Sequence, residues 1–133
     1  MNTLEDRCNA IEECYEFMLA FAAQGLTTEA GGGKGSQVRT FLERALAALR
    51  GISEAYGAAV NAGGDSSAFL AVLDRDAKDS EAAIRLVLAQ PIISSQLIDN
   101  LNASIHLRAL LTDLFLIDEI VKLQNTHKPA TAS

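Results

Sequence analysis

The sequence LRALLTDLFLIDEIVKL, residues 107–123, decides the fold class of this chain. It holds neither Gly nor Pro, and its apolar residues recur at intervals of three and four, the spacing of a helix packed against other helices. The recurring set is Leu107, Leu110, Leu114, Ile117 and Val121. Further apolar side chains lie off that face at Leu111, Phe115, Leu116, Ile120 and Leu123. A helix that is apolar nearly all round is either central in its own fold or shared with another copy.

Three more helical patterns precede this one, over residues 3–26, 36–61 and about 65–90. We expect the last helix to run over residues 95–124 and to be roughly 45 Å long, so that the other three lie along it. A charged stretch at residues 74–81 can break the third helix. The sequence therefore predicts an all-α fold, an up-down antiparallel bundle of four main helices with the third helix whole or broken into two.

The chain of 133 residues fits one domain, and a chain of this length can bury about two-thirds of its unfolded surface. We expect a single helical domain over residues 1–126 and a flexible tail over residues 127–133. The glycine-rich stretch at 31–35 is predicted to be a flexible linker, because glycine loses the most backbone entropy on ordering. A phosphate-binding loop is the alternative, but Lys34 precedes the last glycine and no strand leads into the stretch.

The composition favours close helix packing and self-association. Apolar residues make up 49% of the chain but aromatic residues only 5%. The mean hydropathy of +0.15 is high for a small soluble monomer. We interpret the excess as an interface buried between copies, and the alternative is a monomer with an alanine-rich surface.

The net charge of −6 argues against two classes of partner. Nucleic acid requires a basic surface, and an anionic membrane surface requires a basic amphipathic face. The sequence also has no uncharged apolar run of about 20 residues and no cationic leader at its start. Cys8 and Cys14 are six residues apart, about 240° around a helix, and so cannot bridge each other within it. A reducing cytoplasm is the expected location.

A small group of residues is the candidate for ligand binding. Cys8, Tyr15 and Met18 lie on the first helix, where thiolate and thioether groups suit Cu(I), although Cys and Met are also ordinary core residues. An acid buried on the last helix is a second possibility, with Thr112, Asp113 and Glu119 as the positions to inspect. These patterns assign no metal site and no cofactor.

Catalytic patterns are missing from the sequence. A di-iron bundle needs Glu-x-x-His pairs, and none occurs. A hydrolase triad needs a base beside its nucleophile, and the two histidines do not offer one. His106, followed by Arg108 and Ala109, loosely fits a phosphotransfer histidine, and the alternative is a structural histidine. We therefore expect no catalytic residue.

The sequence favours a non-enzymatic, cytoplasmic helical interaction module: a regulator, adaptor or assembly factor that acts as a homo-oligomer, most simply a homodimer. Another protein is a further possible partner. The predicted interface consists of Leu107, Leu111, Phe115, Leu116 and Ile120. Two alternatives stay open. One is a bundle that binds a small molecule or soft metal through Cys8, Tyr15, Met18 and His106, for example as a small enzyme subunit. The other is histidine phosphotransfer at His106.

Overall fold

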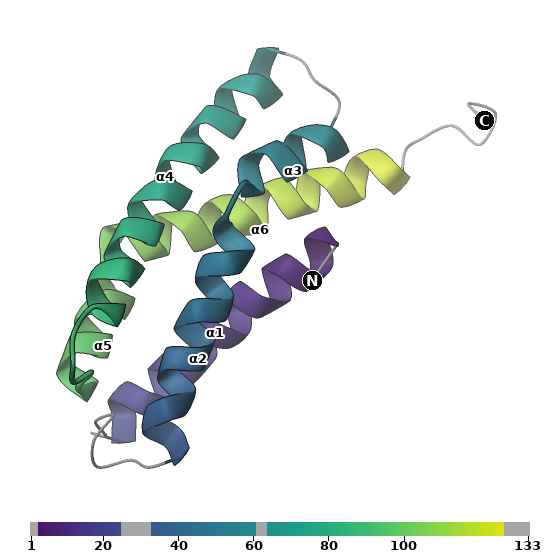
Figure 1. The fold of residues 1–133 in the computed structure, drawn as a ribbon. Helices are drawn as coiled ribbons and strands as arrows, with labels where there is room; N and C mark the ends of the chain where they lie inside the picture. Colours follow the sequence, from purple (N-terminus) through teal and green to yellow (C-terminus); the bar gives the residue numbers. More distant parts are fainter. Residues whose placement is uncertain (1–2, 25–32, 61–63, 127–133) are drawn as a thin grey trace.

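The computed structural model describes residues 3–24, 33–60 and 64–126, and their regular structure is entirely helical (Figure 1). This confirms the all-α prediction. Within these residues the helices are α1 (Leu4–Gln24), α2 (Gly33–Leu49), α3 (Ile52–Ala59), α4 (Gly64–Leu88), α5 (Ser95–Ala103) and α6 (Ile105–Thr126). Six helices therefore take the place of the four expected, and the four-helix up-down arrangement stays a prediction.

The expected single helix over residues 95–124 is wrong, because the chain breaks it at Ser104. This residue has an extended backbone, with φ −64° and ψ 142°, between α5 and α6. Its backbone N–H donates to the Leu101 carbonyl, and its hydroxyl accepts from the Leu107 N–H at 3.3 Å. Ser104 thus ends α5 and caps the start of α6, where the first N–H groups of a helix lack partners.

The expected helix over residues 36–61 is also interrupted, at Gly51, which lies between α2 and α3 with φ 67°. That left-handed conformation is readily adopted by glycine and disfavoured for other residues. By contrast, α4 is continuous through its charged middle, where Lys78 pairs with Asp74 at 2.8 Å and Arg85 with Glu81 at 3.2 Å. The version of the prediction with a broken third helix is therefore wrong.

The predicted glycine-rich linker at 31–35 is partly helical. Helix α2 begins at Gly33, so the helix includes the last three linker residues, and residues 31–32 lie outside the described part of the chain. The predicted tail over residues 127–133 and the last two residues of the predicted first helix, 25–26, also lie outside it.

The helices form two sets of neighbours that are joined through α4. Helix α1 packs mainly on α2 and α5, whereas α6 packs mainly on α4, which also contacts α2, α3 and α5. In the first set, the Phe17 ring on α1 stacks on the Phe41 ring on α2 with centroids 4.5 Å apart. In the second set, the Ser80 hydroxyl on α4 donates to the His106 carbonyl on α6 at 3.0 Å. The result is that α1 and α6 are not close-packed against each other.

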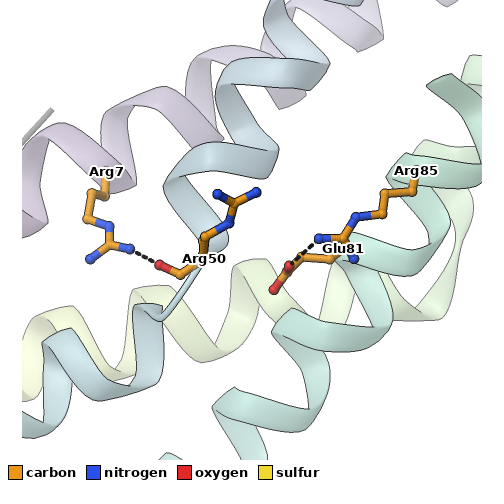
Figure 2. A network of polar contacts seen from close by, with 4 residues as sticks. All are labelled: Arg7, Arg50, Glu81 and Arg85. Atoms are coloured by element: carbon orange, nitrogen blue, oxygen red, sulfur yellow. Dashed lines mark hydrogen bonds and ion pairs between the residues drawn. The ribbon is translucent and has the colours of Figure 1, made fainter.

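Two arginine side chains donate hydrogen bonds to backbone carbonyls at the ends of neighbouring helices. Arg39 on α2 donates to the carbonyls of Leu88, Gln90 and Pro91, at the end of α4. Arg7 on α1 donates to the carbonyls of Ala48 and Arg50 at the end of α2. Figure 2 shows the bond from Arg7 to Arg50 and, separately, the Glu81–Arg85 ion pair of α4. Each guanidinium supplies positive charge and hydrogens where the last helix carbonyls lack intrahelical partners.

The core draws on all six helices. Its largest fully buried side chains are Tyr56, Phe21, Met18, Leu42, Leu49, Ile52, Leu73, Ile84, Ile93, Ile98, Leu110 and Leu114. Helix α6 contributes Leu107, Leu110, Leu114 and Ile117 to the core, and these residues recur at the helical spacing predicted for its apolar face. The remaining apolar side chains of α6 are therefore the ones that bear on function.

Candidate functional site

Helix α6 carries half of the large exposed apolar side chains in the described part of the chain. Ile105 is 75% exposed, Phe115 57%, Leu116 51% and Leu123 44%. Single exposed apolar residues are ordinary, whereas a group on one element points to an interaction surface.

A groove runs between α1 and α6, with a volume of about 460 Å³. It exists because α1 packs mainly on α2 and α5 while α6 packs mainly on α4. Its apolar lining is Tyr15 and Leu19 from α1 and Leu111 and Phe115 from α6. A groove with apolar walls between two helices is the kind of surface that accepts a helix from another chain.

The polar lining of the α1/α6 groove divides by charge. Helix α1 contributes Glu12 and Glu16, whereas α6 contributes Arg108 and the hydroxyl of Thr112. An approaching chain therefore meets an acidic wall and a basic wall. Such a pattern fixes orientation more than it adds affinity.

The five predicted interface residues lie in three places. Phe115 and Leu111 line the α1/α6 groove, although Leu111 itself is only 7% exposed. Leu116 and Ile120 line a second, smaller groove of about 240 Å³ beside Phe69 of α4. Leu107 is buried in the core. Their role as an interface stays a prediction, and Phe115 and Leu116 offer the most surface for it.

The four predicted ligand residues do not form one site. Met18 is buried in the core, and Tyr15 lines the α1/α6 groove. His106 is half-exposed, with its Nδ1 3.9 Å from a carboxylate oxygen of Asp79. Cys8 is buried in the core beside Tyr56 of α3. No group of three or more His, Cys, Asp or Glu side chains in the described residues is arranged to hold a metal ion.

Cys8 belongs to a buried polar pair that the sequence did not indicate. Its Sγ lies 2.6 Å from the hydroxyl of Tyr56 on α3, and the two groups share a hydrogen bond. Burial raises the pKa of both groups, and the nearby Asp118 carboxylate raises them further. Burial also raises the pKa of Cys14 to about 12. Both thiols are free and held in their neutral, unreactive form.

Of the three candidate positions for a buried acid on α6, one is buried. Thr112 and Glu119 are exposed, whereas Asp113 is only 7% exposed. Burial, and after it the neighbouring Asp76 carboxyl of α4, raise the pKa of Asp113 to about 7. A hydrogen bond to the Asp76 carboxyl, which requires one of the two acids to be protonated, contributes to this shift, and Oδ2 has no other partner among the described residues. A strongly perturbed acid beside a second acid is a feature of functional sites as well as of structural pairs.

Comparisons with known proteins add no assignment. No protein-family model matches the chain, and neither the curated proteins nor the solved structures searched contain a significant match. None of the described helices combines the length and the apolar character that a membrane crossing requires.

Proposed function

We propose that this chain is a non-enzymatic helical interaction module that pairs with a second copy of itself through the α1/α6 groove. In this proposal α2 with α3, and α5 with α6, are the interrupted arms of an up-down four-helix bundle. The pair serves as a cytoplasmic regulator, adaptor or assembly factor. The observation that supports it most directly is the groove itself, whose walls carry two exposed apolar side chains, Leu19 and Phe115.

Charge favours a second copy as the occupant of the groove. In a two-fold contact the same surface meets itself, so each residue contact is made twice. Such a contact sets Arg108 of one copy against Glu12 or Glu16 of the other, because these charges lie on opposite walls. A partner that carried only acidic or only basic residues would meet a like charge on one wall.

The apolar contribution is large enough to measure. Phe115 is 57% exposed, so burying the rest of its ring is worth about 1–2 kcal/mol in each copy. Replacing it with glutamate removes that gain twice and places two charges in the contact. We therefore expect Phe115→Glu to weaken pairing by at least about tenfold.

Sedimentation velocity over a range of protein concentrations tests the proposal. The wild-type chain is expected to form a dimer as concentration rises, while Phe115→Glu stays a monomer with unchanged circular dichroism. Leu86→Glu is the matched control, because Leu86 is 67% exposed on α4 and does not line the groove. A wild-type chain that stays monomeric at every concentration refutes the proposal, and so does a Leu86→Glu variant that dissociates as readily as Phe115→Glu.

A further inference from the structure

Helix α6 is joined to the rest of the fold mainly by α4. It has a smaller contact with α5, and the α1/α6 groove lies between it and α1. Ser104, which has an extended backbone, connects α5 to α6. Residues at the ends of elements are where one helix can move relative to its neighbours. The position of α6 therefore depends on what holds it against α4.

Titratable side chains meet across the α4/α6 contact at two places. At the first place the carboxyl groups of Asp76 and Asp113 share a hydrogen bond. At the second, His106 Nδ1 lies 3.9 Å from a carboxylate oxygen of Asp79. The Ser80 hydroxyl donates to the His106 carbonyl at 3.0 Å beside it. Because Asp76, Asp79 and Ser80 are three and four residues apart, they lie on one face of α4, and the two places belong to one contact.

The Asp76–Asp113 pair holds α4 and α6 together only while it keeps a proton. Two carboxyl groups share a hydrogen bond when one of them is protonated, and they repel each other when both are ionised. Asp113 is 7% exposed, so its ionised form also lacks solvation. Burial, and after it the Asp76 carboxyl, raise the pKa of Asp113 to about 7. Near neutral pH the proton leaves to solvent, and repulsion replaces the hydrogen bond.

The contact between His106 and Asp79 responds to pH in the same direction. Histidine is the side chain whose charge ordinarily changes near neutral pH, and His106 attracts Asp79 only while it is protonated. Both side chains are about half exposed, so this attraction is weak on its own. A rise in pH therefore removes an attraction here and adds a repulsion at the Asp76–Asp113 pair.

The other charged groups around α6 do not reverse this response. Arg108, on α6 itself, lines the cleft beside Asp113, and α5 contributes only Ala103 to that cleft. Glu12 and Glu16 of α1 face α6 across the α1/α6 groove. Arginines and solvent-accessible carboxylates ordinarily keep their charge between about pH 6 and about pH 8. Their effect on Asp113 is therefore nearly constant over the interval in which the two contacts change.

We propose that the α4/α6 contact is a pH-sensitive switch. It is closed while Asp76 and Asp113 share a proton and the His106 ring is protonated, and it loosens when these protons are lost. Loosening moves the first half of α6 away from α4 about Ser104 and uncovers part of the apolar face of α6. The switch goes beyond the proposed pairing and does not depend on it, because all of its groups lie within one chain.

Amide hydrogen exchange of the full chain tests the switch, at a protein concentration where sedimentation velocity shows the monomer. The pKa of Asp113 is about 7 in the closed form and returns toward 3.8 in an open form that solvates it, so opening increases about tenfold between about pH 6 and about pH 8. We expect protection factors at residues 107–114 to fall by that factor. They are also expected to stay below those of the buried residues of α1 at both pH values, because α6 opens without the rest of the fold.

Two results of this measurement overturn the proposal. Protection factors at residues 107–114 that do not change between about pH 6 and about pH 8 mean that the contact does not respond to pH. Protection that is equal in α6 and α1 at both pH values means that α6 exchanges only when the whole chain unfolds, so no separate switch exists.

Variants identify the groups that carry the response. Asp113→Asn is expected to abolish the tenfold fall and to leave only the smaller contribution of His106. Asp76→Asn is expected to move the fall to lower pH, because it removes the neighbouring like charge. Asp99→Asn, at an exposed position on α5, is the matched control and is expected to behave as the wild type does. A fall that is unchanged in Asp113→Asn or in Asp76→Asn overturns the proposal, and so does a fall that His106→Gln alone abolishes.

Discussion

Asp113→Asn is expected to stabilise the fold, and to do so only above a certain pH. The wild-type side chain is buried beside the Asp76 carboxyl, and both features favour its neutral form. Asparagine is close to aspartic acid in shape and carries no charge at any pH. The substitution therefore removes the penalty of ionising this group inside the fold and changes little else.

The sign follows from proton binding. The pKa of Asp113 is raised from 3.8 to about 7, so the folded chain binds more protons than the unfolded chain between those values. The free energy of unfolding of the wild type then falls as pH rises through this interval. Below about pH 4 both states are protonated, and above about pH 7 both are ionised, so the contribution is constant on either side.

The magnitude follows from the same two values. A shift of one pH unit corresponds to about 1.4 kcal/mol, so a shift of roughly three units corresponds to about 4 kcal/mol at most. Asparagine still buries a polar amide, and an amide without a full set of partners costs about 1–2 kcal/mol. We therefore expect Asp113→Asn to be more stable than the wild type by about 2–3 kcal/mol above about pH 7, and less stable than the wild type by about 1–2 kcal/mol at about pH 4.

Urea unfolding followed by circular dichroism, at a series of pH values, measures this difference. Asp99→Asn is the control for removing an exposed carboxylate, and its difference from the wild type is expected to stay nearly constant. Subtracting the free energies of unfolding of the variant and the wild type at each pH cancels the titration of the groups that do not interact with Asp113 or Asp76. A difference between Asp113→Asn and the wild type that stays flat from about pH 4 to about pH 8 would refute the reasoning.

Three further substitutions, with Tyr15→Phe as a control, test a buried hydrogen bond and the backbone at two glycines. Tyr56→Phe is expected to lower the free energy of unfolding by about 1–2 kcal/mol, because the buried Tyr56 hydroxyl is the hydrogen-bond partner of Cys8 at 2.6 Å. Tyr15→Phe, which changes a side chain that lines the α1/α6 groove, is the control, and an equal loss in both variants contradicts the reasoning. Gly51→Ala is expected to cost about 1–2 kcal/mol, since its φ of 67° is disfavoured for alanine. Gly57→Ala, within α3, is expected to be neutral or to gain up to about 1 kcal/mol, because its new Cβ would lie 3.6 Å from Leu70 Cδ1, an ordinary contact distance. Urea unfolding that ranks the two glycine variants the other way contradicts this reasoning.

The existence of the helices was predictable from the sequence, but the break at Ser104 was not. Periodicity reports which face of a helix is apolar, and it continues across Ser104 because Leu101 and Ile105 keep the helical spacing. At the break the Ser104 backbone is extended and its hydroxyl accepts from the Leu107 N–H, and apolar spacing carries no signal for either feature. The opposite error concerned residues 74–81, whose charges suggested a break. Pairs four residues apart on one helix face instead support the helix there.

Half of the acid pair was visible in the sequence. Asp113 stood out as an acid on a helix that is apolar nearly all round, which is why it was a position to inspect. Asp76 gave no signal, since it lies in a charged stretch that resembles an ordinary solvated surface. The contact between Asp76 and Asp113 depends on how α4 and α6 are aligned against each other, and no local sequence pattern determines that alignment. The same holds for Arg39, whose three carbonyl partners lie at the end of a distant helix.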